Sequence, residues 1–298
     1  MNPTRLLALA ASPYVAAALL GKRVVVTGAN KGIGKAIVRK ILSDHPSVSV
    51  YLGSRDTARG EAACSDLRSE LGDACCEGRL EMLPIDVTND ASVKAAAEIV
   101  TSSGEPLYGL INNAGIGFGR TIDETLETNL YGARRVSEAL VPLLLPDEGR
   151  VVNIASASGP MFVAGLGSPE QAFWADPALL PSWGELEEHL ARYKGAPDYD
   201  GVAYGLSKAA LNVYTQQLAA QFPALRVNSC SPGYIKTDLT AGMGATAPPE
   251  KGALAPLQLL LGDLPPPSQG GTARYYGSDA VRSPLDRYRG PGDPPYSP

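Results

Sequence analysis

The chain has few of the residues that hold metal ions or build disulfide frameworks. Its 298 residues include four cysteines and two histidines: Cys64, Cys75, Cys76, Cys230, His45 and His189. The cysteines show neither the paired spacing of a zinc site nor the density of a disulfide-stabilised scaffold. We therefore expect no bound metal and a reducing compartment, the cytoplasm.

An excess of positive charge is also missing. The formal net charge is -5, with 44% hydrophobic and 19% charged residues, as in an ordinary globular protein. A chain without a basic surface is a poor ligand for nucleic acid or for anionic membranes. We expect a small-molecule partner and no nucleic acid.

No uninterrupted hydrophobic run marks a membrane anchor. The first twenty residues are mostly apolar, but Pro13 breaks them, and Lys22 and Arg23 lead straight into the first expected strand. That leaves no room for a cleavage site and a linker. We interpret residues 1–21 as an apolar extension and expect no stable membrane insertion, while targeting to an organelle stays open.

Short β-branched runs alternate with longer helical stretches along the chain. The expected strands are residues 23–27, 48–52, 80–85, 108–111, 150–154 and 225–229. Amphipathic segments such as residues 35–43 and 91–101 separate them, a pattern of βαβ units around a parallel sheet. The sequence predicts an α/β fold, a Rossmann-like doubly wound sheet in a three-layer αβα sandwich, as a single domain over residues 22–288.

Two regions depart from this alternation. At about residues 159–200 several prolines accompany Trp174 and Trp183, which we interpret as an insertion with short helices. Residues 289–298, RGPGDPPYSP, have the composition of a flexible tail.

A glycine cluster, TGANKGIG, follows the first strand. Gly28, Gly32 and Gly34 let the backbone turn sharply and approach a pyrophosphate, whose charge meets the N-terminus of a helix that begins near Ile33. A tight strand-to-helix turn without a ligand is the alternative.

The end of the second strand indicates which dinucleotide would bind. A fold that prefers NAD usually carries an acid there for the ribose hydroxyls, but here Ser54 and Arg55 occupy that place. With Lys31 and Arg59, Arg55 can surround a ribose 2′-phosphate with positive charge. The pattern favours NADPH/NADP⁺; three basic residues on a solvated edge are the alternative.

A second group of residues points to chemistry. Tyr204 and Lys208 are four apart, so on a helix they share one face. Ser156 follows a strand, and Asn129 lies in a helical stretch after the NNAG at residues 112–115. Each residue alone has a purely structural alternative. Ser156 could cap a loop, Asn129 could be a satisfied buried amide, and Lys208 could be a solvated helix residue.

The motifs together resemble those of the short-chain dehydrogenase/reductase family and span about residues 22–240. In order they are Thr27-Gly28-x-x-x-Gly32-x-Gly34, Asp86, Asn112-Asn113-Ala114-Gly115, Asn129, Ser156, Tyr204-x-x-x-Lys208 and Pro232-Gly233. TGANKGIGKAIVRKI, SRDTARG, SPEQAFW and PGYIKTDL are similar to the monomeric carbonyl reductases within it. The resemblance implies that the insertion covers the helical face through which other members associate, and hence a monomer.

The residue types suit the reduction of a carbonyl. Hydride from a nicotinamide needs a matching proton for the developing alkoxide. Tyr204 would be the proton donor, Lys208 would stabilise its phenolate and Ser156 would hold the substrate oxygen. The resemblance implies that Asn129 positions a water that connects Lys208 to solvent.

The resemblance also implies further cofactor contacts. They involve Asn30 and Ile33 in the glycine loop, Asp86 and Val87 at the adenine, Asn113 near the adenosine ribose, Pro232 and Gly233 near the nicotinamide, and Thr237 at its carboxamide, besides Tyr204 and Lys208. For the substrate pocket we name Gly117, Phe118, Met161, Phe162 and Tyr234.

The leading hypothesis is an NADPH-dependent reductase of ketones, aldehydes or quinones. A reductase dedicated to one biosynthetic or steroid-like ketone is a rival of the same class. A non-catalytic protein that senses NADPH is a rival of another class, although a sensor has no need of the intact Ser156, Tyr204 and Lys208.

Overall fold

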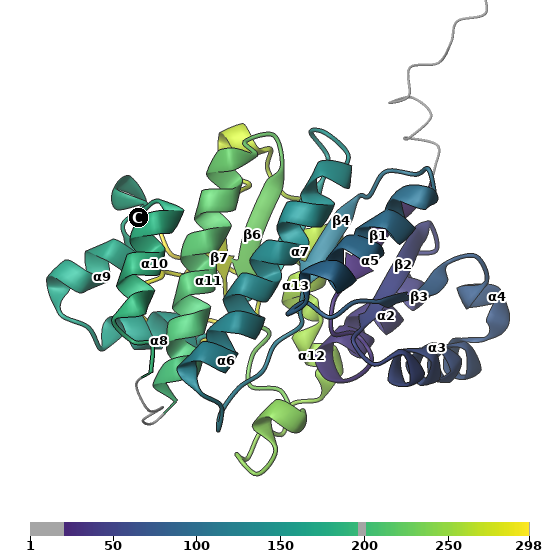
Figure 1. Cartoon of the computed structure of the whole chain (residues 1–298), viewed down its shortest axis with the longest axis horizontal. Coiled ribbons are helices and arrows are strands. Elements are labelled where there is room, and N and C mark those ends of the chain that lie inside the picture. Colours follow the sequence, from purple (N-terminus) through teal and green to yellow (C-terminus); the bar gives the residue numbers. More distant parts are fainter. Residues whose placement is uncertain (1–20, 196–200, 298) are drawn as a thin grey trace, which may run out of the picture.

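The computed structural model describes residues 21–195 and 201–297. Nearly all of the predicted apolar extension, residues 1–21, therefore lies outside the described residues. The strands are β1 (Lys22–Val26), β2 (Val48–Ser54), β3 (Leu80–Pro84), β4 (Gly109–Asn112), β5 (Arg150–Ile154), β6 (Arg226–Cys230) and β7 (Arg274–Tyr276). They form one parallel sheet in the order β3-β2-β1-β4-β5-β6-β7 (Figure 1).

Helices cover both faces of this sheet because its strands are apolar on both sides. In β1, Val24 and Val26 pack into one hydrophobic cluster and Val25 into the other, as alternating side chains must. The first cluster is completed by α2 (Gly32–Asp44), α3 (Thr57–Leu71) and α13 (Leu254–Leu261), and the second by α5 (Asp90–Ser102), α7 (Gly132–Leu140) and α11 (Val202–Gln221). The predicted three-layer Rossmann-like sandwich is confirmed.

The remaining elements are short. They are α4 (Asp73–Cys76), α6 (Ile122–Leu126), the π-helical segment η1 (Glu127–Tyr131), η2 (Val141–Leu143), α8 (Ser158–Ala164), α9 (Ser168–Ala175), η3 (Pro177–Leu179), α10 (Trp183–Ala191), η4 (Asp238–Thr240), α12 (Pro249–Gly252) and η5 (Pro267–Gln269). Helices α8, α9 and α10 occupy the predicted insertion and lie beside α11 at one end of the molecule (Figure 1).

The strand order places a switch point between β1 and β4. Strand β1 pairs with β2 on one side and with β4 on the other. From β1 the chain continues outward to β2 and β3, and from β4 it continues outward in the opposite direction to β5, β6 and β7. Ligands of open α/β sheets bind in the crevice outside the carboxyl ends of strands at such a point. The glycine loop follows β1 and the NNAG turn follows β4, so both border this crevice.

The segment predicted as a flexible tail begins with an anchored residue. Arg289 is buried, and its guanidinium lies 2.5 Å from the carboxylate of Asp279. Farther along, the amide of Tyr296 donates a hydrogen bond to the carbonyl of Arg282. The structure thus holds the described part of this segment against the domain at two points, which its composition does not indicate.

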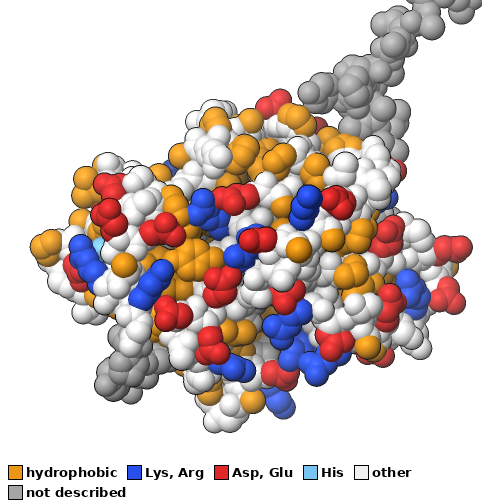
Figure 2. All heavy atoms as spheres, viewed as in Figure 1, with side chains coloured by type: hydrophobic (Ala, Val, Ile, Leu, Met, Phe, Trp, Pro, Cys, Tyr) orange, Lys and Arg blue, Asp and Glu red, His pale blue; other side chains and the backbone are white. Residues whose placement is uncertain are grey.

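Charged side chains of both signs are interspersed over the face seen in Figure 2. No helix within residues 21–195 and 201–297 is both long and apolar enough to cross a lipid bilayer.

Candidate active site

Close packing explains the glycines of the loop after β1. Gly28 and Gly32 have φ angles of 61° and 56°, in the left-handed region. At Gly34 a Cβ would lie 2.5 Å from the side-chain nitrogen of Asn113 and 2.6 Å from the carbonyl oxygen of Gly28. The loop therefore folds tightly onto the turn after β4 and directs the N-terminus of α2 at the crevice.

Asn113 supports this loop. Its side-chain amide donates hydrogen bonds to the carbonyl oxygens of Thr27 (2.8 Å) and Gly28 (3.0 Å), and its backbone amide donates to the Thr27 hydroxyl (3.0 Å). Asn113 thereby fixes the glycine loop and also lines the crevice beside it, where a contact with the cofactor ribose stays a prediction.

The crevice is a cleft of about 690 Å³. It is lined by these predicted cofactor residues: Gly28, Asn30, Lys31, Gly32, Ile33, Gly34, Arg55, Arg59, Asp86, Val87, Asn113 and Thr237. It is also lined by residues that sequence reasoning missed: Thr88, Ile116, Arg120, Thr128, Lys236, Asp238, Leu239 and Pro249. Four other predicted cofactor residues do not line it: Tyr204, Lys208, Pro232 and Gly233.

Basic side chains rim one part of this cleft. Lys31 pairs with Asp238 at 2.5 Å, although both side chains are largely exposed. Arg59 lies 3.5 Å from Asp56, which also caps α3 by accepting a hydrogen bond from the Arg59 amide. Arg55 forms no ion pair with any residue that the structure describes, so its guanidinium is available to an anion.

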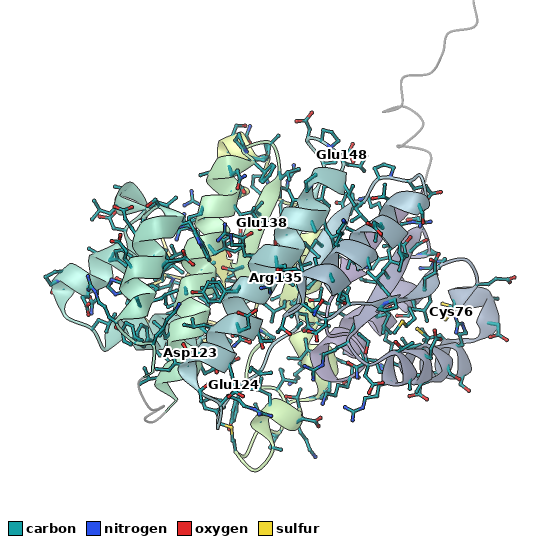
Figure 3. All side chains as sticks on the ribbon, viewed as in Figure 1. Cys76, Asp123, Glu124, Arg135, Glu138 and Glu148 are labelled. Atoms are coloured by element: carbon teal, nitrogen blue, oxygen red, sulfur yellow. The ribbon has the colours of Figure 1, made fainter. Side chains whose placement is uncertain are left out.

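Asp86 and Val87 lie in a turn after β3 that is held from two sides. One oxygen of the Asp86 carboxylate accepts hydrogen bonds from the amide (3.0 Å) and the hydroxyl (2.7 Å) of Thr88. Arg135 lies on α7 (Figure 3), and its guanidinium donates to the carbonyl of Val87 at 2.6 Å. The turn is therefore fixed before any ligand contacts it.

Tyr204 and Lys208 lie one turn apart on α11, and Ser156 lies just after β5. The Ser156 hydroxyl lies close enough to the Tyr204 phenol to act on its pKa, and it hydrogen-bonds with the Ser158 hydroxyl at 3.3 Å. Burial raises the pKa of Tyr204 and outweighs the opposite effect of Ser156. The phenol thus keeps its proton at neutral pH.

Lys208 is only 4% exposed and lies close to Tyr204. Its ammonium donates a 2.7 Å hydrogen bond to the carbonyl of Ile154 and is 5.6 Å from the centroid of the Tyr204 ring. Burial lowers the pKa of Lys208 to about 8. The three residues form one cluster at the carboxyl end of the sheet.

Asn129 lies within the π-helical segment η1, and such bulges are frequent at functional sites. Its side chain exchanges two 2.9 Å hydrogen bonds with the backbone of Ile116 and donates a third, of 3.0 Å, to the Ser207 hydroxyl. Asn129 thereby ties the loop after β4 to the helix that carries Tyr204 and Lys208.

Phe118 connects the cluster of Ser156, Tyr204 and Lys208 to the cleft. It lines the cleft, and its ring centroid is 5.1 Å from that of Tyr204. Of the other residues named for the substrate pocket, Gly117 lines the cleft, Phe162 packs against Trp174, and Met161 and Tyr234 are exposed.

Comparison with known proteins agrees with this geometry. The sequence model of short chain dehydrogenase matches residues 22–168, and that of enoyl-(acyl carrier protein) reductase matches residues 189–260. The chain is 33% identical to (+)-neomenthol dehydrogenase of Arabidopsis thaliana over 80% of this chain and 90% of that protein. It is 34% identical to carbonyl reductase [NADPH] 1 of Homo sapiens over 86% and 96%, respectively.

Solved structures show the same likeness. The menthone neomenthol reductase of Mentha piperita superposes with a TM-score of 0.68 at 28% identity, covering 87% of this chain and 99% of that one. The sequence motifs, the seven-stranded sheet and these relatives agree, and the chain belongs to the short-chain dehydrogenase/reductase family.

Proposed function

We propose that this protein reduces the carbonyl group of a small ketone, aldehyde or quinone to the alcohol, with NADPH as hydride donor and Tyr204 as proton donor. The observation that carries the proposal is the cluster of Ser156, Tyr204 and buried Lys208 beside a cleft with basic side chains at its rim. Relatives named carbonyl reductase [NADPH] and (+)-neomenthol dehydrogenase support this reaction class.

The cleft fits a phosphorylated dinucleotide. Gly28 and Gly34 leave no space for a side chain between the loop and its neighbours, which suits a loop that a pyrophosphate approaches closely. Arg55, with Arg59 and Lys31, would hold the 2′-phosphate, and Asp86 and Val87 would border the adenine. When bound, NADPH supplies the hydride that the carbonyl carbon receives.

The catalytic cluster would supply the proton. Tyr204, protonated at neutral pH, donates its phenolic proton to the carbonyl oxygen as negative charge develops there. Ser156, which lies beside Tyr204, holds the same oxygen. The Lys208 ammonium stabilises the phenolate that remains. Asn129 holds the loop after β4 in a fixed position relative to α11, which carries Tyr204 and Lys208.

Aromatic and apolar side chains favour a substrate with an apolar body. Phe118 lies against Tyr204, and a Cβ on Gly117 would be 2.7 Å from the Leu239 side chain. Apolar walls with few polar groups are typical of sites that orient a hydrophobic ligand. We therefore place hydrophobic ketones and quinones ahead of charged carbonyl compounds.

The pH dependence of the reaction follows from the state of Lys208. We expect kcat/KM for carbonyl reduction to fall as pH rises through about 8, because Lys208 then loses the charge that stabilises the phenolate. The measurement is a pH profile of kcat/KM with NADPH saturating. Lys208→Arg, which stays charged, should shift the decline to higher pH, and a wild-type profile that stays flat through this range contradicts the assignment.

We further propose that the protein is a monomer, and expect one chain per particle in size-exclusion chromatography with light scattering. Helix α10 covers the outer face of α7 and α11: the Trp183 ring lies 3.8 Å from the Arg134 guanidinium carbon and 5.9 Å from the Tyr214 ring, and Leu186 and Leu190 are fully buried. A covered apolar face offers little to a second copy. A stable dimer would contradict this proposal.

The direct test of the proposed reaction follows the absorbance of NADPH with a panel of aldehydes, ketones and quinones. We expect turnover that depends on the carbonyl compound. Binding of NADPH without turnover of any member of a broad panel would overturn the proposal. The cytoplasmic location stays a prediction.

A further inference from the structure

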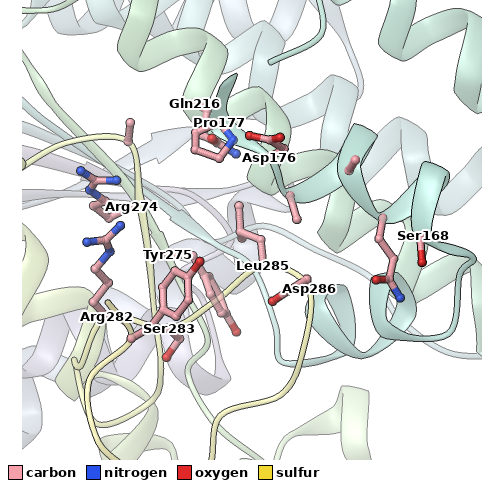
Figure 4. Close-up of a pocket in the computed structure, with 15 residues that line it drawn as sticks. Ser168, Asp176, Pro177, Gln216, Arg274, Tyr275, Arg282, Ser283, Leu285 and Asp286 are labelled. Carbon is pink, nitrogen blue, oxygen red and sulfur yellow. The ribbon is translucent and has the colours of Figure 1, made fainter. Parts of the chain in front are cut away.

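A second cavity, of about 520 Å³, shares no lining residue with the glycine cleft. It is built where the insertion meets the C-terminal part of the chain: α9 and the turn after it, Gln216 of α11, strand β7 and residues 282–296 (Figure 4). Neither the proposed cofactor nor the proposed proton donor uses it. Its lining is therefore free for another ligand.

Two guanidinium groups meet at one end of this cavity. Arg274, on β7, and Arg282 lie near each other there (Figure 4), and the positive charge of Arg274 adds to burial in lowering the pKa of Arg282. Neither side chain forms an ion pair within residues 21–195 and 201–297. Holding two like charges together in a half-buried place costs free energy, which an anion between them would offset.

The carboxylates of the lining are engaged elsewhere. Asp286 pairs with Arg287 through both oxygens, at 2.9 and 3.0 Å. Asp176 accepts a 2.9 Å hydrogen bond from the amide of Ala178. Neither is among the charges that act on the pKa of Arg282. The two guanidiniums are thus left to an external anion.

The cavity is larger than a bare ion needs. The Arg282 guanidinium lies 5.5 Å from the centroid of the Tyr296 ring, and the Tyr296 amide donates to the Arg282 carbonyl at 3.1 Å. Tyr296 and Leu285 give the lining an aromatic and an aliphatic side chain beside the two cations. Such a wall accepts the organic part of a ligand.

We propose that this cavity binds a small organic oxyanion, a phosphate monoester or a carboxylate, whose charged group lies between Arg274 and Arg282. The planar guanidinium presents paired donors that match either group. The ligand would bind outside the glycine cleft, at a place that the insertion and the C-terminal segment create together.

Isothermal titration of the full chain with phenyl phosphate, and separately with benzoate, tests this proposal. We expect saturable binding at one site for at least one probe, and the tighter probe identifies the oxyanion class. Arg274→Gln and Arg282→Gln should each weaken binding at least about tenfold, because a charge-assisted hydrogen bond is removed. Arg282→Lys should bind more weakly than the wild type, since it keeps the charge but loses the paired donors.

Two controls separate this site from others. Arg55→Ala removes a cation from the glycine cleft, and Arg192→Gln removes an exposed cation of the insertion that does not line the cavity. Both should bind the probes as the wild type does. Absence of saturable binding in the wild type, unchanged affinity in Arg282→Lys and both glutamine variants, or loss of binding in Arg55→Ala would overturn the proposal.

Discussion

Replacing Tyr204 with phenylalanine should lower kcat/KM for carbonyl reduction by a factor of roughly 10² to 10⁴, the usual contribution of a positioned general acid. The change removes only the phenolic oxygen, and with it the proton and the effect of the neighbouring Ser156 hydroxyl. The ring, which packs against Phe118, stays in place. The measurement compares steady-state rates and the affinity for NADPH of the two proteins.

The matched control is Tyr193→Phe. Tyr193 belongs to the aromatic cluster of the insertion, where its ring lies 6.1 Å from that of Phe162. This variant should keep wild-type rates. If Tyr204→Phe retained wild-type kcat/KM, Tyr204 would not be the proton donor, and a loss of NADPH binding in that variant would point to a structural role.

Arg55→Ala should raise the dissociation constant for NADPH by about ten- to a hundredfold and leave that for NADH nearly unchanged. A charge-assisted hydrogen bond contributes roughly 1.5–3 kcal/mol, and each 1.4 kcal/mol changes affinity about tenfold. Arg55 is the basic residue at the end of β2, and it forms no ion pair in the described part of the chain. Its charge is thus not already neutralised by a carboxylate. Titration of the protein's fluorescence with each cofactor measures the effect.

Lys40→Ala is the control for a general change of charge. Lys40 is on α2, pairs with Asp44 at 2.8 Å and does not line the cleft. It should alter the affinity for neither cofactor. Equal losses for NADPH and NADH in Arg55→Ala would count against a contact with the 2′-phosphate.

Much of the fold is visible in local patterns. Alternating β-branched runs and amphipathic stretches place six of the strands within one or two residues of their observed bounds, because burial on both faces of a sheet requires such runs. Strand β7 was missed. It has three residues in a region rich in proline and glycine, and its pairing with β6 depends on contacts far away in the sequence.

The glycine loop and the Tyr204–Lys208 pair are equally local. A spacing of four residues places two side chains on one face of any helix, and a glycine cluster between a strand and a helix has few uses besides a tight turn and a phosphate cradle. The sequence alone therefore places these features, and their roles stay predictions.

Other parts of the site depend on packing between distant segments. The pairing of Lys31 with Asp238 joins residues 207 positions apart, and Phe118 meets Tyr204 because the loop after β4 folds over α11. Asn113 lines the cleft, and its amide also holds the glycine loop through the carbonyls of Thr27 and Gly28. The residues next to each partner in the sequence give no indication of these contacts.

The sequence by itself therefore determined the class of fold, the glycine turn and the placing of Tyr204 and Lys208 on one helix face, since periodicity and spacing encode which side chains share a face. Only the tertiary structure decided which loops meet across the cleft, how the described part of the tail is held, and that Arg274 and Arg282 share a cavity. The physical reason is that these contacts follow from how the insertion and the C-terminal segment pack on α11 and β7, a result of many weak interactions that no single motif carries.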